Sequence, residues 1–415
     1  MWTRRLLQRT ETALRLQRSV AMQPCRVEPP PELLTPLRVP DKILLGPGPS
    51  NCSPRVLHAL SLPVVGHLHP ECTQVMDEVK AGLRYVFQTR NAATLAVSAT
   101  GHGGMEMALC NLVEPGDVVL VVVGGLWGQR AADMARRYGA DVRLCEKLPG
   151  QNFSLQELEA EVARHRPAVV FAIQGDSSTG VYQPLQGAGQ MCHRYDSLLV
   201  VDTVASLCGV PFLMDEWEID VVYSGSQKVL GTPPGLAPIS FSPRAVAKVE
   251  SRKSPPSVFY WDLKLLGNYW ACFDEPRKYH HTASSNLLCA LREGLAQVAE
   301  EGLQACVERH GRCSAQLWEG LARLWLQPFA EGSAARLPTV NAVRLPEDVD
   351  FRAMQEHAAS NYSMEIAAGL GPTAGKAFRV GLMGYNATPG RVALVLRVIE
   401  EGLELARSAQ MPSRL

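Results

Sequence analysis

Short runs of consecutive apolar residues recur through the middle of the chain, and each is followed by a turn and a longer segment of mixed polarity. Apolar runs without alternation are typical of strands buried on both faces of a largely parallel sheet, with helices between the strands. We therefore predict one doubly wound α/β domain over residues 41–300. The predicted strands are residues 94–97, 118–123, 168–173, 198–201, 221–224 and 237–241.

The pattern changes beyond residue 300. A long helical periodicity over residues 303–326 precedes shorter apolar runs at 339–344 and 378–381, which predicts a smaller α+β domain over residues 301–412. Before residue 41, a proline-rich stretch predicts an N-terminal arm over residues 23–40. The predicted fold class is therefore α/β, with a large, mostly parallel-sheet domain and a smaller C-terminal domain.

Composition narrows the class of protein. Of 415 residues, 46% are hydrophobic, which is enough to build a large core and excludes general disorder. Lys+Arg and Asp+Glu each number 41, so the chain lacks the basic excess of a nucleic-acid binder. The longest apolar run, residues 118–123, is far shorter than the roughly 20 residues of a membrane helix, so we expect a soluble protein. The 11 cysteines are scattered without a C-x-x-C pair, which predicts reduced thiols rather than disulfides or zinc ligands.

Both ends of the chain resemble targeting signals. Residues 1–22 carry five arginines and one acid, with an imperfect amphipathic stripe, and predict a mitochondrial transit peptide; a solvated basic helix is the alternative. Residues 413–415 read Ser-Arg-Leu, one charge-preserving change from the peroxisomal signal S-K-L. We expect a start at Met1 to lead to the mitochondrial matrix and a start at Met22 to leave the peroxisomal signal to act, with import receptors as partners.

The candidate functional residues lie directly after the predicted strands, where open α/β sheets bind ligands. Residues 98–104 (SATGHGG) form a small-residue turn before a predicted helix that starts at Met105, and such a turn suits a phosphate group. An ordinary strand-to-helix turn is the alternative. Asp202 follows the strand at 198–201, where a carboxylate needs either a cation to face or a helix to cap.

Lys228 follows the strand at 221–224 on a loop of small residues. Burial there would lower the pKa of the amine and make it nucleophilic, whereas a surface lysine is the alternative. A phosphate cradle, a carboxylate and a lysine in this order are what pyridoxal phosphate requires. The lysine forms the Schiff base, the carboxylate pairs with the pyridinium nitrogen, and the helix N-terminus holds the phosphate.

These segments also carry a resemblance to a known family. Over residues 28–400 the chain is similar, in collinear order, to the alanine–glyoxylate (serine–pyruvate) aminotransferases, which belong to the class V, fold-type I group of pyridoxal phosphate enzymes. The segments that carry the resemblance are LLGPGPSN, YVFQTRN, EPGD, WGQRA, SSTGVYQPL, CHRY, VDTVASLCG, YSGSQK, PPG, YHHT and GLGPTAGKAFRVGLMGYNAT.

The resemblance implies a role for each candidate residue. Lys228 matches the catalytic Schiff-base lysine, and Arg379 matches the arginine that binds the substrate carboxylate. The positions that match cofactor contacts are Asp202 at the pyridine nitrogen, Trp127 and Val204 on the two ring faces, Ser177 near the phenolic oxygen, and Thr100, Gly101, His102 and Gln227 at the phosphate. Tyr279 and Thr282 match positions that reach the phosphate of a neighbouring subunit, which implies a homodimer.

The leading hypothesis is a ping-pong transaminase that uses L-alanine or L-serine as amino donor and glyoxylate or pyruvate as acceptor. A cysteine desulfurase-like lyase of the same fold is an alternative, but it needs a mobile cysteine in the small domain, and residues 314–415 contain none. A non-catalytic interaction protein that kept the fold is another alternative. We predict no metal site, because the pairs His67/His69 and His280/His281 have no third ligand at a usual spacing.

Overall fold

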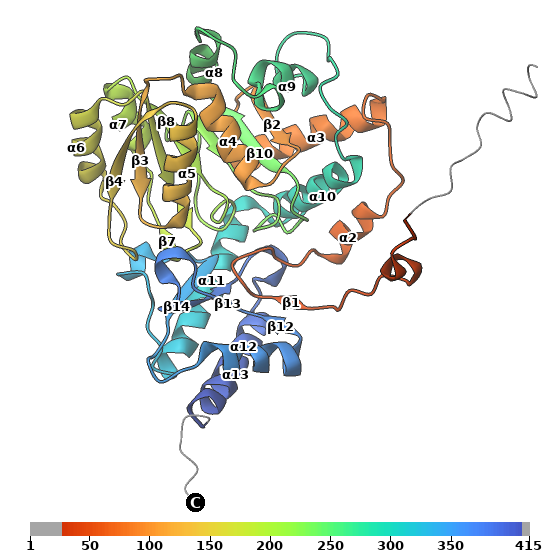
Figure 1. Ribbon diagram of the computed structural model, residues 1–415, viewed down its shortest axis with the longest axis vertical. Helices are drawn as coiled ribbons and strands as arrows, with labels where there is room; N and C mark the ends of the chain where they lie inside the picture. The colour runs from red at the N-terminus through yellow and green to blue at the C-terminus, as the bar shows by residue number, and fades with distance from the viewer. Residues whose placement is uncertain (1–26, 409–415) are drawn as a thin grey trace, which may run out of the picture. The chain divides into compact units, whose positions relative to one another are not determined.

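The computed structural model describes residues 27–408 (Figure 1). The predicted targeting segments, residues 1–22 and 413–415, lie outside this range. The chain divides at Asp41 into two units, and the described part of the first contains one short helix, η1 (Pro31–Leu34). Within residues 27–408, no helix has the length and apolar composition that crossing a membrane requires.

A seven-stranded sheet forms the centre of the second unit. Only β10 runs antiparallel to its neighbours, so the expected mostly parallel sheet is confirmed. The strands in spatial order are β2 (Ala93–Val97), β10 (Ala237–Phe241), β9 (Val221–Tyr223), β8 (Leu198–Asp202), β5 (Val169–Ile173), β3 (Val118–Val123) and β4 (Asp141–Glu146).

The apolar runs of the sequence form the inner strands because both faces of the sheet are covered. Every residue of β2, β5, β8, β9 and β10 is buried. Within this seven-stranded sheet, the strand that was not predicted from the sequence is β4, whose sequence DVRLCE is mostly exposed because it lies at the edge of the sheet. Charged side chains protect such an edge from pairing with other chains.

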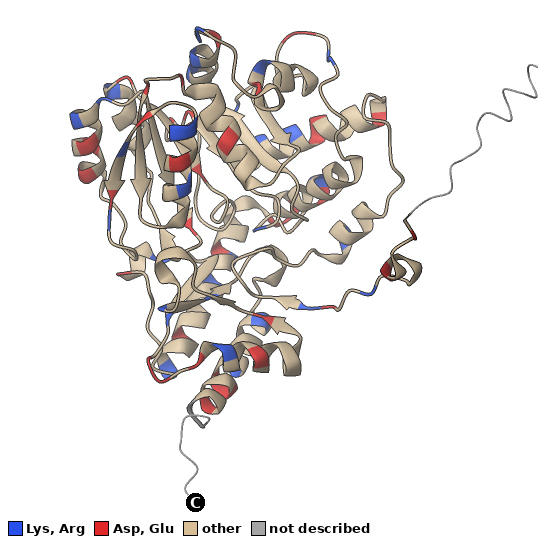
Figure 2. Ribbon diagram, viewed as in Figure 1, with Lys and Arg blue, Asp and Glu red and all other residues tan. Residues whose placement is uncertain are grey.

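Helices connect the strands along the chain and pack on the sheet. In Figure 1, α4 and α5 lie in front of the strands, and the charged residues of the molecule lie mainly on helices and loops (Figure 2). The helices of this part are α2 (Pro54–Leu60), α3 (Pro70–Phe87), α4 (Gly101–Leu112), α5 (Leu126–Arg137), α6 (Leu155–His165), α7 (Ala188–Arg194), α8 (Pro243–Glu250), η2 (Phe259–Trp261), α9 (Leu263–Tyr269) and α10 (Ser285–Glu301). Two short strands, β6 (Gly175–Asp176) and β7 (Val181–Tyr182), form a hairpin after β5.

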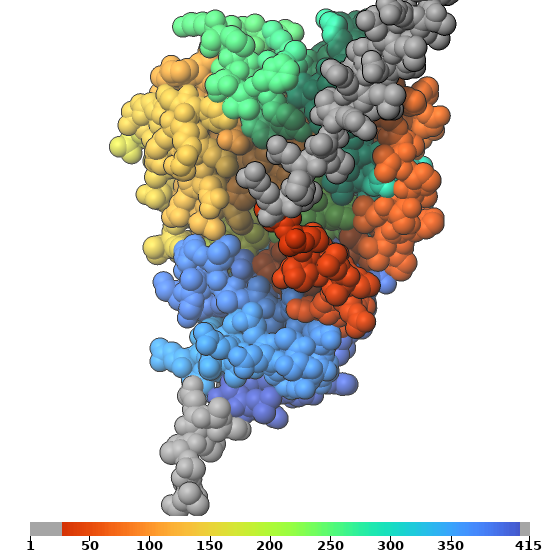
Figure 3. Space-filling model, turned by 45° about the vertical axis from the view of Figure 1, so that its right-hand side comes forward, coloured from red at the N-terminus to blue at the C-terminus, as the bar shows by residue number. Residues whose placement is uncertain are grey.

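The C-terminal residues build a second, smaller core. Here a three-stranded antiparallel sheet, in the order β11-β14-β13, packs with three helices. Figure 3 shows these residues in blue beneath the yellow and green segments. Its elements are α11 (Leu303–Arg323), η3 (Ser333–Ala335), β11 (Val340–Arg344), α12 (Phe351–Tyr362), β12 (Met364–Glu365), β13 (Ala367–Ala368), η4 (Gly371–Thr373), β14 (Ala377–Gly381), η5 (Gly384–Asn386) and α13 (Pro389–Ser408).

The start of the second unit belongs with this smaller core. β1 (Ile43–Leu44) pairs in parallel with β12, and Leu45 is buried among residues of α11, α13 and β14. The predicted boundary at residue 41 assigned this segment to the large domain. The structure instead joins it to residues more than 300 positions later, and the loop that follows it reaches the large sheet.

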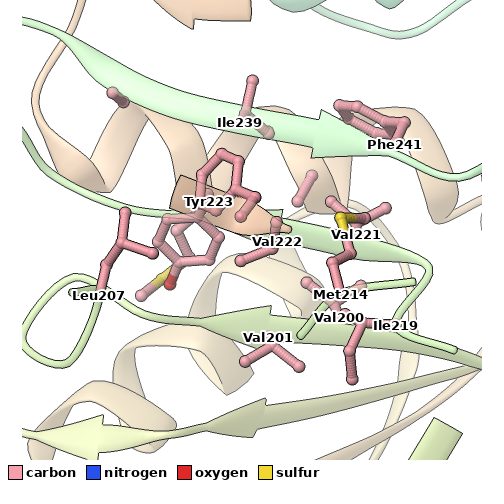
Figure 4. Packing of buried hydrophobic residues seen from close by; sticks show 14 of the residues in the cluster. Val200, Val201, Leu207, Met214, Ile219, Val221, Val222, Tyr223, Ile239 and Phe241 are labelled. Atoms are coloured by element: carbon pink, nitrogen blue, oxygen red, sulfur yellow. The ribbon is translucent and has the colours of Figure 1, made fainter. Parts of the chain in front are cut away.

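The larger core holds the strand ends in place. Aliphatic side chains of β8, β9 and β10 pack around Tyr223, which is fully buried (Figure 4). Close packing of this kind tolerates little displacement, so the residues that follow these strands are held at defined positions.

Candidate active site

The carboxyl ends of β2, β3, β5, β8 and β9 face one cavity. Nine of the twelve predicted site residues line it, which brings together positions from five separate segments of the chain. The lining residues are Thr100, Gly101, His102, Met105, Trp127, Gly175, Ser177, Asp202, Val204, Ala205, Tyr223, Gln227 and Lys228.

The turn after β2 forms an anion-binding end of a helix. Thr100 is the N-cap of α4, and the helix begins at Gly101 rather than at Met105 as the sequence analysis expected. A Cβ at Gly101 would lie 3.0 Å from Val204, so glycine lets the helix start this close to the cavity wall. The first N–H groups of a helix have no partner within it and lie at the positive end of its dipole. The Thr100 side chain makes no capping bond within the described chain, so its hydroxyl can bind an anion too.

Gln227 adds a polar side chain to the same wall. Its Oε1 atom is buried and has no hydrogen-bond partner within residues 27–408. An amide in this state needs a ligand, because an unsatisfied buried polar group costs free energy. Rotating the side-chain amide by 180° would present its N–H₂ group, which can donate to a phosphate oxygen.

Asp202 is a buried carboxylate held by two donors. The Tyr223 phenol donates to Oδ2 at 2.5 Å, and the Val204 backbone N–H donates to Oδ1 at 2.7 Å. Burial raises the pKa of Asp202 to about 6, although both hydrogen bonds and the charge of Lys228 oppose this rise. The carboxylate is therefore mostly ionised at neutral pH, and it is suited to a cationic partner in the cavity.

Lys228 is the amine of the site. Its Nζ donates a hydrogen bond to the carbonyl oxygen of Pro47, in the loop that joins β1 to α2. Burial and, to a smaller extent, the charge of Arg379 lower the pKa of Lys228 to about 8, although Asp202 opposes the change. An amine with this pKa has a substantial uncharged, nucleophilic fraction near neutral pH. A side chain at Gly48 would overlap Lys228, so the loop can cover the lysine only with glycine there.

Trp127 has a fixed orientation in the cavity wall. Its Nε1 donates to the hydroxyl of Ser177 at 2.8 Å, and its ring meets the ring of His102 edge-on at 5.4 Å. Burial and the neighbouring Arg130 lower the pKa of His102, so this imidazole stays neutral and accepts from Arg130 at 3.2 Å. The indole is thus held in place on two sides and offers a face for a flat ring.

Arg379, on β14 of the smaller sheet, contacts the cavity wall at Ser177, and its side chain lines a neighbouring pocket together with Pro47 and Gly48. Nε and Nη2 donate to the carbonyl oxygen of Ala368, at 3.0 and 2.8 Å, and Nη1 donates to the carbonyl oxygen of Ser177 at 2.9 Å. A guanidinium has five N–H groups, so these bonds leave one on each terminal nitrogen. Such a pair suits bidentate binding of a carboxylate. Burial lowers the pKa of Arg379 to about 10, which still leaves it charged at neutral pH.

Tyr279 and Thr282 lie outside the cavity. Both side chains are exposed, and their hydroxyls approach each other at 3.3 Å. The structure therefore does not bring these two predicted residues to the cavity of their own chain. The third predicted residue that does not line the cavity is Arg379, which contacts Ser177 in the cavity wall.

The structure adds three groups that the sequence analysis missed. Tyr223 ends β9 directly opposite Asp202 on β8, so adjacent strand ends could have indicated it. The Pro47 carbonyl contacts Lys228 across 181 positions, and a backbone atom leaves no sequence signal. Asp176 is buried beside Ser177, and its Oδ2 has no hydrogen-bond partner among the described residues. Burial raises the pKa of Asp176, and the charge of Arg379 partly offsets the effect.

Comparison with known proteins gives a consistent result. A family model described as aminotransferase class-V matches residues 55–386. The chain is 53% identical over 382 residues to an alanine–glyoxylate aminotransferase of Drosophila melanogaster, a match that covers 92% of this chain and 97% of the relative.

Solved structures agree with this. An alanine–glyoxylate aminotransferase from Nostoc sp. superposes with a TM-score of 0.86 at 46% identity, covering 91% of this chain and 98% of that one. The ureidoglycine–glyoxylate aminotransferase of Bacillus subtilis gives a TM-score of 0.87 at 35% identity, covering 91% and 96%.

The residues of the cavity fit the cofactor of this family. The open helix end at Gly101 and the orphaned Gln227 amide suit a phosphate, and the ionised Asp202 suits a pyridinium nitrogen. Lys228 supplies an amine whose pKa is low enough for attachment to an aldehyde. The chain belongs to the class-V aminotransferases, which use pyridoxal 5'-phosphate.

Proposed function

We propose that this chain transfers the amino group of L-alanine, or L-serine, to glyoxylate, or pyruvate; alanine and glyoxylate would give pyruvate and glycine. The observation that carries the proposal is the position of Arg379. It contacts the Ser177 carbonyl at the wall of the cavity that contains Lys228, and it has two N–H groups left for a carboxylate. The relatives from Drosophila melanogaster and Nostoc sp. are named for alanine and glyoxylate, which supports this substrate pair.

We assign the cofactor contacts to residues of the cavity. Lys228 would hold pyridoxal phosphate covalently, and Asp202 would pair with its ring nitrogen. Trp127 and Val204 would pack on the two ring faces, and Ser177 would meet the phenolic oxygen. Thr100, Gly101, His102 and Gln227 would bind the phosphate. When bound, the cofactor withdraws electrons from the substrate's α-carbon and stores the amino group between the two half-reactions.

The chain's own groups then have distinct tasks. Arg379 binds the substrate carboxylate and so fixes the α-carbon relative to the ring. Lys228 Nζ would be freed when the amino group of the substrate takes its place on the cofactor. The free amine would then accept the proton from the α-carbon, because its pKa near 8 lets the same nitrogen take and return a proton near neutral pH. Asp202 stays ionised with the help of the Tyr223 phenol and supports the positive charge of the ring nitrogen.

One site serves both half-reactions, so pyruvate must leave before glyoxylate enters. This predicts ping-pong kinetics with parallel double-reciprocal lines. Intersecting lines would mean that both substrates bind together and would contradict the proposal.

The direct test is the visible absorbance of the purified protein. We expect the cofactor band of the wild-type protein to bleach with L-alanine and return with glyoxylate. Lys228→Ala should remove the lysine-dependent band, whereas Lys253→Ala, at an exposed position, should behave as wild type. A band that ignores alanine but responds to another amino acid would overturn the substrate assignment. Absence of any band after adding pyridoxal phosphate would support a non-catalytic role.

We also propose a homodimer in which Tyr279 and Thr282 bind the phosphate in the partner's cavity. Both side chains are exposed and lie outside the cavity of their own chain, with their hydroxyls 3.3 Å apart, and this position supports contact with another subunit. Sedimentation should give a dimer, and Tyr279→Phe should weaken pyridoxal phosphate binding. A monomer that binds the cofactor normally would overturn this assignment.

For localisation, we propose import into the mitochondrial matrix from a start at Met1 and into peroxisomes from a start at Met22. The arginine-rich residues 1–22 and the C-terminal Ser-Arg-Leu support this. The test expresses both forms untagged, because a C-terminal tag would mask the tripeptide, and detects them with an antibody. Mitochondrial import of the form that starts at Met22 would contradict the proposal. Deleting Leu415 from that form should leave it in the cytosol.

A further inference from the structure

A chain of hydrogen bonds connects the turn that carries Thr100 and Gly101 to a histidine pair outside the cavity. The hydroxyl of Ser98, two residues before the N-cap of α4, lies 2.6 Å from His281 Nε2. His281 Nδ1 lies 3.0 Å from His280 Nδ1, and His280 Nε2 lies 3.4 Å from the carbonyl oxygen of Phe259.

The direction of this chain follows from its last acceptor. A carbonyl oxygen can only accept, so Nε2 of His280 carries a proton, and in the tautomer with a single ring N–H its Nδ1 presents a lone pair. His281 must then donate through Nδ1, which leaves its Nε2 as an acceptor for the Ser98 hydroxyl. Burial and the neighbouring histidines His280 and His67 lower the pKa of His281 to about 4, so its ring is neutral at physiological pH.

Aromatic rings hold the pair against the turn. The Tyr260 ring lies 5.5 Å from His280 and 5.1 Å from His281, and its hydroxyl donates to the Ser98 carbonyl oxygen at 3.5 Å. Tyr269 meets His281 edge-on at 5.5 Å. Ser98 is therefore held at its side chain by His281 and at its backbone by Tyr260.

We propose that His281 is a positioning residue that sets the phosphate-binding turn by accepting a hydrogen bond from the Ser98 hydroxyl. This rests on the proposed function, because it concerns the same cofactor site. It gives the segment 279–282 two tasks: the exposed Tyr279 and Thr282 face outward, whereas His281 holds the turn of its own chain.

Two near-isosteric variants separate the two nitrogens of His281. In His281→Gln, Oε1 takes the place of Nε2 and can still accept from Ser98, whereas in His281→Asn the amide takes the place of Nδ1 and only the link to His280 survives. We expect His281→Asn to weaken pyridoxal phosphate binding by the apoprotein about tenfold, which corresponds to about 1.4 kcal/mol. We expect His281→Gln to stay within about threefold of wild type, about 0.7 kcal/mol on the same scale.

Pyridoxal, which lacks the phosphate, is the matched control ligand. Its binding should change by less than about twofold in either variant, because a twofold change is only about 0.4 kcal/mol. Ser98→Ala should reproduce His281→Asn, and the double variant should be no weaker than either single variant, since both remove the same bond. Melting temperatures of the apoproteins show whether the variants are folded.

The outcomes are distinguishable. Equal pyridoxal phosphate affinity in His281→Asn and wild type would overturn the positioning role while leaving the proposed function intact. Equal losses for pyridoxal and pyridoxal phosphate, or additive effects of Ser98→Ala and His281→Asn, would also overturn it. A wild-type protein that binds no pyridoxal phosphate would instead refute the proposed function itself.

Discussion

Arg379 donates a hydrogen bond from Nη1 to the carbonyl oxygen of Ser177 at 2.9 Å, although 202 positions separate the two residues in the chain. This bond joins β14 of the smaller sheet to the turn of the β6–β7 hairpin, which follows β5 of the larger sheet. The same turn presents the Ser177 hydroxyl to Trp127. The carboxylate-binding group and the ring-binding group of the site are thus held by one short segment.

Arg379→Lys should raise KM for both alanine and glyoxylate. Lysine keeps the positive charge but cannot bind Ala368 and Ser177 while offering two parallel donors to a carboxylate. We expect KM to rise by about 10- to 100-fold, which is the loss of one charge-assisted hydrogen bond. Steady-state kinetics measure this, and Arg344→Lys on the exposed end of β11 is the control. An unchanged KM would show that another group binds the carboxylate.

Tyr223→Phe should make Asp202, the residue assigned to the ring nitrogen of the cofactor, less ionised at neutral pH. Without the phenol, Asp202 loses a donor that stabilises its ionised form, so its pKa should rise further above about 6. A hydrogen bond to a charged group contributes about 1.5–3 kcal/mol, so we expect kcat to fall at least tenfold near pH 7. The fall should shrink at higher pH, where Asp202 ionises again. A loss that is the same at every pH would contradict this explanation.

Asp202→Asn should make the apoprotein more stable while abolishing most of its activity. Burial raises the pKa of Asp202 from 3.8 to about 6, so its ionisation favours the unfolded chain as pH rises through this range. Linkage gives about 3 kcal/mol of lost stability at pH 8 and about half as much at pH 5. Urea unfolding of the two apoproteins at both pH values measures the difference. A variant that is less stable than wild type at pH 8 would contradict the sign.

The attachment of pyridoxal phosphate to the apoprotein should depend on the ionisation of Lys228. Only the uncharged amine is nucleophilic, and the pKa of Lys228 is lowered to about 8. The rate constant should therefore rise about tenfold between pH 7 and pH 9 and then level off. Rapid-mixing absorbance measures it. A rate that continues to rise tenfold per pH unit above pH 9 would indicate an ordinary exposed lysine.

Part of the fold was readable from local patterns. The strands at 118–123 and 237–241 appear in the structure with the predicted bounds, because a strand buried on both faces is mostly apolar. The polar residue of the second strand, Ser240, is hydrogen-bonded to Thr94 on the neighbouring strand. The edge strand β4 was not predicted, since its exposed DVRLCE sequence follows no such rule. The spatial order of strands and the reversal of β10 depend on packing between distant segments.

The sequence by itself determined which residues are candidates for the active site, because a glycine-rich turn, Asp202 and Lys228 each follow an apolar strand. Open α/β sheets bind ligands at the carboxyl ends of their strands, which is the physical reason for this placement. Trp127 and Arg379 were assigned only through resemblance to a family. The tertiary structure alone decided that Tyr223 supports Asp202, that the Pro47 carbonyl binds Lys228, and that His281 holds Ser98. These contacts span from 21 to 183 positions, and a one-dimensional pattern contains no distance across the fold.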